Sequence, residues 1–233
     1  MNVERINPLA GDDEELLALH RARYQFASGF VRGKRTLDIA CGTGYGTEIL
    51  SHEGSVQVLG VDISLEALMF ARKHYASHNV IFLEGNAEQI PDVGKIDIVI
   101  SFETIEHLQN PNKFLEGIKR ILPKEGMLII STPIRSKGTL ETEPDNPFHV
   151  REWNENEFMS LLSSYAFKCD PYYQFVIRKK KYPGSRTVTK IIANTFAPLE
   201  YAAYFKFPVT KTPSNFRTIE LIKGYLIVVC VLQ

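Results

Sequence analysis

Short aliphatic stretches alternate with longer amphipathic stretches between residues 34 and 132. This alternation is typical of βαβ units, which place parallel strands in one sheet with right-handed crossovers and helices on both faces. The pattern therefore predicts a doubly wound α/β fold. The predicted strands are Arg35–Ile39, Val56–Val61, Val80–Leu83, Ile96–Ser101 and Met127–Ser131, and the predicted helices are Thr47–Ser51, Leu65–Tyr75 and Lys113–Leu122.

The flanking segments complete one predicted domain over residues 1–233. Apolar residues at helical spacing predict one or two helices at about 12–31. Asn154 and Glu157 have the spacing of a capping box, which predicts a helix through Tyr165. Strands are expected at about 168–177 and 225–232. Residues 178–217 between them are basic, aromatic and punctuated by prolines, which favours a lid or insertion.

Charge and cysteine content exclude several classes of protein. The 27 Lys and Arg residues balance 27 Asp and Glu residues, so net charge gives no reason to expect nucleic acid as a partner. Cys41, Cys169 and Cys230 are an odd number without a CxxC pair, which argues against disulfides and a zinc site and favours a cytoplasmic location. The first residues lack the features of a secretory signal. The most apolar stretch, residues 225–232, is far shorter than the roughly 20 residues of a membrane-spanning helix.

A glycine-rich turn follows the first predicted strand, in the segment LDIACGTGYG over residues 37–46. Turns at the carboxyl ends of strands are where doubly wound sheets bind ligands, and glycine lets the backbone approach a ligand closely. The same glycines also serve tight strand-to-helix turns without any ligand. The turn alone leaves both interpretations open.

Residues in and beside the turn restrict the class of ligand that it could bind. Asp62 ends the second predicted strand, where a carboxylate can accept both hydroxyls of a ribose. Thr47 stands where the dinucleotide fingerprint has its third glycine, which disfavours a pyrophosphate cofactor. The carboxylate of Asp38 would repel a phosphate but would attract an ammonium group. Together these residues predict an amino-acid nucleoside as the ligand.

These segments resemble the motifs of class I S-adenosylmethionine (SAM)-dependent methyltransferases, including ubiquinone-pathway O-methyltransferases. The resemblance rests on residues 38–46, Asp62, residues 86–91, residues 98–103 and residues 121–126. It implies a seven-stranded, mostly parallel sheet whose last strand is antiparallel, and SAM bound over the carboxyl ends of the first strands. The implied cofactor-binding residues are Tyr24, Asp38, Ala40, Cys41, Gly42, Thr43, Gly44, Asp62, Ile63, Asn86, Ala87, Glu88, Phe102 and Glu103. For Tyr24, simple core packing is the alternative.

The acceptor side is predicted from an acidic and histidine-rich stretch after the fourth strand. Glu103, Glu106 and His107 would share one face of a helix, and His149 lies in the loop after the fifth strand. Glu103, His107 and His149 are candidate catalytic residues. All four residues could bind Mg²⁺ or Mn²⁺, as similar residues do in small-RNA 2′-O-methyltransferases. The alternative is that Glu103 touches the cofactor, Glu106 is a surface charge and His107 is structural.

The predicted function is methyl transfer from SAM to an oxygen or nitrogen atom of a small-molecule acceptor. RNA 2′-O-methylation is a second hypothesis, which the acidic and histidine residues permit and the neutral net charge disfavours. A third is a SAM-binding sensor or partner protein without catalysis.

Overall fold

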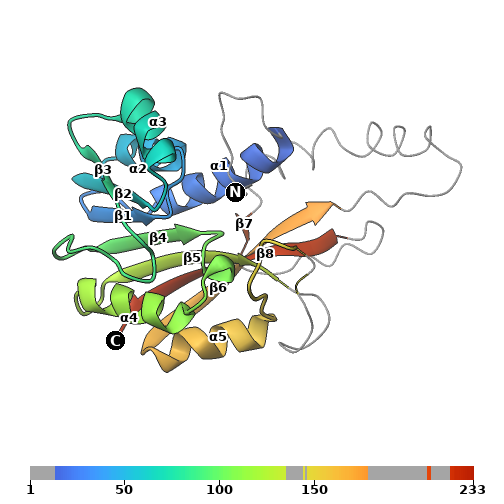
Figure 1. Cartoon of the computed structure of the whole chain (residues 1–233). Helices are drawn as coiled ribbons and strands as arrows, with labels where there is room; N and C mark the ends of the chain where they lie inside the picture. The colour runs from blue at the N-terminus through green and yellow to red at the C-terminus, as the bar shows by residue number, and fades with distance from the viewer. Residues whose placement is uncertain (1–13, 135–143, 145, 178–208, 211–220) are drawn as a thin grey trace, which may run out of the picture.

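Five parallel strands form one half of a sheet in the computed structural model, which describes residues 14–134, 144, 146–177, 209–210 and 221–233 (Figure 1). Their order is β3-β2-β1-β4-β5. Each predicted strand is present, with ends displaced by at most a few residues. The bounds are β1 Arg35–Ile39, β2 Gln57–Asp62, β3 Val80–Glu84, β4 Ile98–Phe102 and β5 Met127–Pro133.

The other half of the sheet is antiparallel. β8 (Leu221–Leu232) lies between β5 and β6 (Phe167–Ile177) and is antiparallel to both. The expected seven-stranded sheet with its last strand antiparallel is therefore confirmed. Among the described residues, the two-residue strand β7 (Val209–Thr210) adds an eighth strand at the edge. It is the part of the predicted lid, residues 178–217, that the structure describes.

Helices cover both faces of the sheet (Figure 1). One face carries α1 (Glu14–Ser28), α2 (Tyr45–His52) and α3 (Leu65–Tyr75), and the other carries α4 (Pro111–Ile121) and α5 (Glu155–Ser164). Sequence signals set several helix ends. Ser64 caps α3, and the predicted capping box of α5 is complete, because Asn154 accepts from the Glu157 amide and Glu157 accepts from the Asn154 amide.

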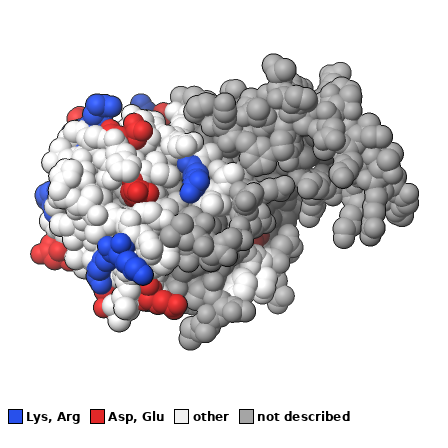
Figure 2. Space-filling model, turned by 90° about the horizontal axis from the view of Figure 1, so that it is seen from above, with Lys and Arg blue, Asp and Glu red and all other residues white. Residues whose placement is uncertain are grey.

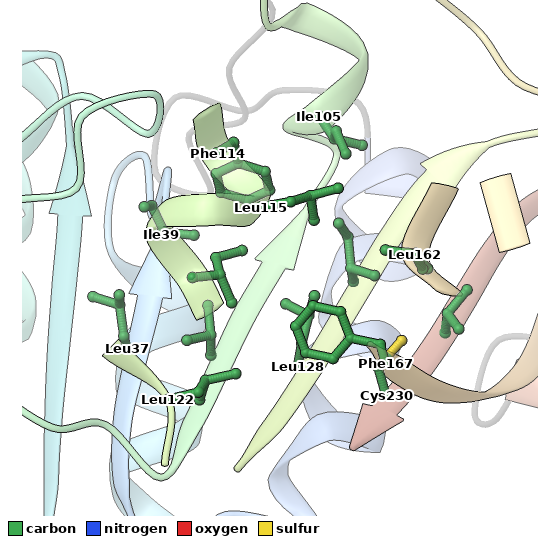
Figure 3. Packing of buried hydrophobic residues seen from close by; sticks show 14 of the residues in the cluster. Leu37, Ile39, Ile105, Phe114, Leu115, Leu122, Leu128, Leu162, Phe167 and Cys230 are labelled. Carbon is green, nitrogen blue, oxygen red and sulfur yellow. The ribbon is translucent and has the colours of Figure 1, made fainter. Parts of the chain in front are cut away.

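Two apolar clusters pack against the sheet, one on each face. Phe114 and Leu115 of α4 and Leu162 of α5 meet β1, β5 and β8 in the cluster of Figure 3. Leu50 and Leu68 from α2 and α3 belong to the second cluster, with α1. Burial on both faces explains why the central strands are continuous aliphatic runs rather than alternating ones.

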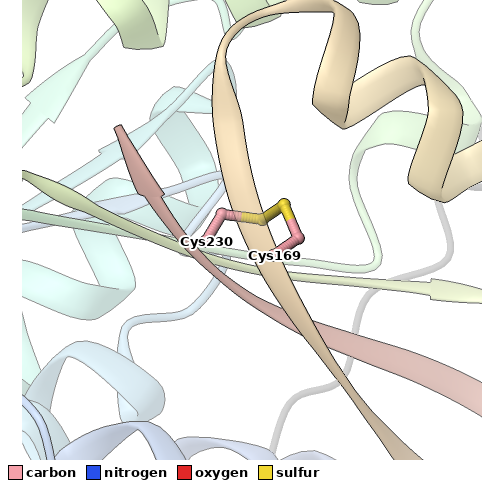
Figure 4. Close-up of a disulfide and its surroundings, with 2 residues drawn as sticks. All are labelled: Cys169 and Cys230. Atoms are coloured by element: carbon pink, nitrogen blue, oxygen red, sulfur yellow. A yellow bond between two sulfur atoms is a disulfide. The ribbon is translucent and has the colours of Figure 1, made fainter. Parts of the chain in front are cut away.

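A disulfide joins β6 to β8, and the sequence-based expectation that cysteines would be unpaired was wrong. Cys169 and Cys230 are directly opposite in the antiparallel register (Figure 4). The two cysteines are 61 residues apart in the sequence and are brought together by strand pairing, which the cysteine spacing does not reveal. Cys41 is free and buried. No helix in the described part of the chain has the length and apolar content needed to cross a membrane.

Candidate functional site

A cavity of about 630 Å³ opens at the carboxyl ends of β1, β2, β4 and β5, which is a usual size for a ligand site. It brings together most of the residues predicted from the sequence. Three predicted residues, Asp38, Gly44 and Glu88, are not in its wall. The predicted residues that line it are Tyr24, Ala40, Cys41, Gly42, Thr43, Asp62, Ile63, Asn86, Ala87, Phe102, Glu103, Glu106, His107 and His149.

Asp62 fixes the glycine turn to the end of β2. Its Oδ2 accepts a hydrogen bond from the Gly42 amide at 2.8 Å, and its Oδ1 accepts one from the Ser64 amide at 2.8 Å. Asp62 also borders the cavity, where its carboxylate would face the ribose hydroxyls of a bound nucleoside. Gly42 has φ 56° and borders the cavity. The turn and the acid are therefore side by side, as the nucleoside prediction requires.

The other glycines of the turn are explained by packing. A Cβ on Gly46 would lie about 2.1 Å from the Tyr24 ring, and one on Gly44 would lie 2.7 Å from the Ala71 Cβ. Because Gly46 has no side chain, the ring of Tyr24 from α1 can pack against the turn. Tyr24 is 6% exposed and also lines the cavity, so it belongs to both the core and the site.

Asp38 lies beneath the turn rather than in the cavity wall. It is completely buried and accepts hydrogen bonds from the Tyr24 hydroxyl (3.0 Å) and the Thr47 hydroxyl (2.6 Å). Burial raises the pKa of Asp38 to about 7, although these hydrogen bonds oppose the shift. Its predicted contact with an ammonium group stays a prediction.

Residues after β3 divide between the cavity and the neighbouring helix. Asn86 lines the cavity, and its Oδ1 accepts from the Glu88 amide at 2.8 Å, which leaves one acceptor position for an adenine amino group. Glu88 turns away and accepts from the Asn110 amide at 2.8 Å, just before α4. Its predicted contact with the cofactor is therefore not supported by its position.

Glu103 departs from the predicted helix face. It has φ 51°, a strained left-handed conformation for a residue with a side chain. Its carboxylate accepts from the Ser131 hydroxyl at 2.6 Å and lies 3.8 Å from Arg23 Nη1. The expected helix is a single 3₁₀ turn, η1 (Ile105–His107), because the chain turns left-handed at Glu103. Glu103 therefore does not join Glu106 and His107.

Glu106, His107 and His149 form a compact cluster. One potential ligand atom from each lies within 4.8 Å of the other two. The carbonyl of Glu106 accepts from the amides of Val150 and Arg151 at 2.8 and 3.1 Å, so η1 holds the loop that carries His149. The sequence predicted this meeting of distant residues, but not the backbone bonds that produce it.

Glu106 is completely buried, contrary to the alternative that it is a surface charge. Its Oε2 accepts from the Thr132 hydroxyl at 3.2 Å, and its Oε1 has no hydrogen-bond partner among the described residues. Burial, and then the charge of Glu103, raise the pKa of Glu106 well above its usual value.

Hydrogen bonds fix the neutral tautomers of both histidines. His107 Nδ1 lies 3.0 Å from the Phe148 carbonyl, which can only accept, so Nδ1 carries the proton and Nε2 has the lone pair. His149 Nδ1 lies 2.6 Å from Glu152 Oε1, and its Nε2 lies 3.0 Å from Asn146 Nδ2. A neutral His149 therefore donates to Glu152 and accepts from Asn146.

Several residues in the cavity wall were not predicted. His20 and Leu16 lie about one and two turns before Tyr24 on α1, and this spacing of four residues was visible in the sequence. Five more lining residues directly adjoin predicted site residues in the sequence: Tyr45, Gly85, Thr104, Leu108 and Phe148. Pro133, Asn146 and Tyr225 also line the cavity and carry no comparable signal in the sequence.

The sequence and the fold are similar to those of known proteins. The model of a family described as "Methyltransferase domain" matches residues 30–190. A "Probable S-adenosylmethionine-dependent methyltransferase" of Mycobacterium tuberculosis (strain CDC 1551 / Oshkosh) is 33% identical over 152 residues, which cover 64% of this chain and 54% of that protein. A "Ubiquinone biosynthesis O-methyltransferase" of Glaesserella parasuis serovar 5 is 35% identical over 108 residues, covering 43% of this chain and 45% of that protein. The chain thus spans about half the length of these relatives.

Solved structures agree on the fold. The YcgJ protein of Bacillus subtilis superposes with a TM-score of 0.63 at 18% identity, covering 92% of this chain and 99% of that chain. An S-adenosylmethionine-dependent methyltransferase of Mesorhizobium loti gives a TM-score of 0.58 at 16% identity, with 91% and 99% covered. Since the family model spans more than half of its length, the chain belongs to the SAM-dependent methyltransferases, as its motifs predicted.

Proposed function

We propose that the chain transfers a methyl group from SAM to an oxygen or nitrogen atom of a small acceptor. One observation carries this proposal: the glycine turn and Asp62 open into the same cavity as His107 and His149. SAM supplies an activated methyl group, and the protein mainly has to align donor and acceptor. Asp62 and Asn86 would hold the nucleoside, and the histidines would face the acceptor.

His107 is the proposed proton acceptor for a hydroxyl nucleophile. The Phe148 carbonyl fixes the proton on Nδ1, so that Nε2 can take a proton from the acceptor. His149 stacks edge-on against His107 with ring centroids 5.0 Å apart, and Glu152 orients it. Glu103, the third predicted catalytic residue, is held by Ser131 and would shape the wall.

A divalent cation is a second candidate, favoured by the short distances within the cluster of Glu106, His107 and His149. One carboxylate and two imidazoles suit Mn²⁺ or a similar ion, and the Nδ1 bonds of both histidines match those that orient metal ligands. Glu106 Oε1 is available, but Asn146 occupies His149 Nε2 and would have to turn away. Proton transfer to His107 needs no such change.

Loss of the Asp62 carboxylate should weaken cofactor binding. In Asp62→Asn an amide nitrogen replaces one oxygen, which removes acceptors for the ribose and for one loop amide. We expect binding of S-adenosylhomocysteine to weaken by about 1–3 kcal/mol, measured by calorimetry. Glu84→Gln is the matched control, because Glu84 pairs with Asp62 across β2 and β3 but lies outside the cavity wall. Equal affinities in Asp62→Asn and the wild-type chain would refute the nucleoside assignment.

Replacing His107 should slow the transfer without affecting the cofactor. With labelled SAM and pooled small metabolites, His107→Gln should lower product formation by about 10²–10⁴-fold, the usual contribution of a general base. Binding of S-adenosylhomocysteine should stay unchanged, and exposed His52→Gln should behave as the wild-type chain. Activity that resists chelation supports His107 as the base. Activity lost in chelator and restored by Mg²⁺ or Mn²⁺ supports the cation instead.

The neutral net charge and the charges on one face of the molecule favour a small acceptor over RNA. On the face shown in Figure 2, basic and acidic side chains are interspersed rather than gathered into a basic patch. Polyanion binding relies on clustered Lys and Arg. In the same assay, a labelled RNA product would overturn this assignment. Cofactor binding without any labelled product would favour the non-catalytic alternative.

A further inference from the structure

Three of the seven exposed large apolar side chains in the described part of the chain lie together at α3. Ile63, just before the helix, is 63% exposed, and Leu65 and Met69 within it are 53% and 68% exposed. Single apolar side chains are common on protein surfaces, whereas grouped ones mark sites of contact. Ile63 also lines the cavity, so a bound nucleoside would cover part of it. Leu65 and Met69 do not line the cavity and require another partner.

These two side chains lie on the outer face of α3. The helix packs on α2, β2 and β3 at one end of the sheet (Figure 1). Its buried residues Ala67, Leu68 and Ala71 form the inner face. Leu65 and Met69 are four residues apart, so they share one face, and at 3.6 residues per turn this face is turned away from the inner one. Seen from the side of α3, the described surface is uncharged between scattered acidic and basic groups (Figure 2).

Charged residues of opposite sign flank the apolar side chains. Glu66 lies in the first turn of α3 and Lys73 in the last turn, on the same outer face. Both are exposed, and neither makes an ion pair with another described residue. Met69 lies near the midpoint between them. If a second α3 packs antiparallel across Met69, Glu66 of each copy therefore meets Lys73 of the other. Such self-complementarity is what a two-fold contact between identical subunits requires.

We propose that two copies of this chain form a dimer through antiparallel contact of their α3 helices. Met69 of both copies lies near the two-fold axis, Leu65 packs beside it, and two pairs of Glu66 with Lys73 close the ends. The antiparallel arrangement also places the positive end of each helix dipole beside the negative end of the other. A second copy is favoured over a lipid surface, because lipid-binding faces are predominantly basic and this face has an acid and a base.

The proposed contact leaves the acceptor side of the cavity free. Ile63 belongs both to the cavity wall and to the exposed surface at α3. His107 and His149 follow β4 and β5, which β1 separates from β2 and β3 in the sheet. The dimer would therefore border the nucleoside end of the cavity without covering the two histidines. The inference goes beyond the proposed methyl transfer and does not depend on it.

Analytical ultracentrifugation of the full chain tests the dimer directly. Because one short helix from each copy makes a small interface, we expect a weak dimer with a dissociation constant on the order of 10–100 µM. Met69→Gln should raise this constant about tenfold, because it places two amides at the apolar centre of the contact. Val56→Gln is the matched control, since Val56 is 65% exposed but lies outside α3, and it should leave the constant unchanged.

Exchange of the charges tests the antiparallel arrangement. Glu66→Lys makes both ends of the contact basic and Lys73→Glu makes both ends acidic, so each variant alone should be monomeric where the wild-type chain is dimeric. An equimolar mixture of the two should form a heterodimer, because every facing pair then has opposite charges. Glu53→Lys and Lys95→Glu, at exposed positions outside α3, are the controls and should dimerise as the wild-type chain does. If circular dichroism shows that a charge variant does not fold, Met69→Gln decides the question.

Two results would overturn the proposal. The first is a wild-type chain that stays monomeric up to about 1 mM, well above the range expected for a weak specific contact. Binding of that monomer to phosphatidylserine vesicles, with loss of binding in Met69→Gln, would assign the face to a membrane instead. The second is a dimer that folded Met69→Gln and the folded charge variants form as readily as the wild-type chain. Either result leaves the proposed methyl transfer intact, because the changed residues lie outside the cavity wall.

Discussion

Asp38 carries an electrostatic penalty at the base of the site. Its carboxyl has a pKa of about 7 in the folded chain, against an ordinary value of 3.8, chiefly because it is buried. The folded chain therefore holds this proton more tightly than the unfolded chain does. Stability is highest while Asp38 is protonated, and it falls as the pH rises from about 4 to about 7.

Replacement of Asp38 should make stability less sensitive to pH. In Asp38→Asn, the stability relative to the wild-type chain should rise by about 2 kcal/mol between pH 5 and pH 8, because the variant has no proton to lose. Urea unfolding of the ligand-free chain at both values measures this difference. Asp92→Asn, at an exposed position, is the control. A stability difference that is the same at both pH values would contradict the buried proton.

Individual residues differ in how well the local sequence predicts their place in the structure. The sequence left Tyr24 as either core or site, and the structure places it in both. Arg23 was not predicted, because an arginine on an amphipathic helix normally faces solvent. Its partner Gln174 lies 151 residues away, so the burial of Arg23 depends on strand pairing that no local pattern encodes.

Elements were predictable where local chemistry defines them. α3 has the predicted bounds, and the capping box of α5 is formed as expected, because caps involve residues three apart. The predicted helix from Glu103 was wrong: this residue is left-handed, and its carboxylate contacts Ser131 and Arg23, which lie in other elements and carry no local signal. The cavity residues that lie in local motifs were thus easier to predict than those that lie in loops.

The disulfide between β6 and β8 predicts the number of reactive thiols. Unfolded in denaturant without reductant, the chain should have one thiol that alkylates, that of Cys41, and after reduction it should have three. Mass spectrometry counts the labels, and Cys41→Ser should give none without reductant. Because the bond closes a 61-residue separation, reduction should lower stability by about 2–4 kcal/mol. Three labelled thiols before reduction would disprove the bond.

At the scale of the whole molecule, the alternation of strands and helices was sufficient to predict a doubly wound sheet. Aliphatic runs define the five parallel strands, because both faces of those strands are covered. The antiparallel placement of β8 came from the family resemblance rather than from the pattern. Periodicity gives the direction of side chains within a strand, but not the neighbour with which the strand pairs.

The central place of β8 in the sheet has a consequence for synthesis on the ribosome. β8 is the last of the described strands along the sequence, yet it lies between β5 and β6. Until it emerges, β5 has an unpaired apolar edge and β6 has no attachment to the parallel half. Arg23 and Tyr24, made early, must likewise wait for later strands to cover them. Between the synthesis of β5 and that of β8, nascent chains of this protein thus expose unpaired strand edges that are prone to aggregate. Chaperones would bind these edges during that interval.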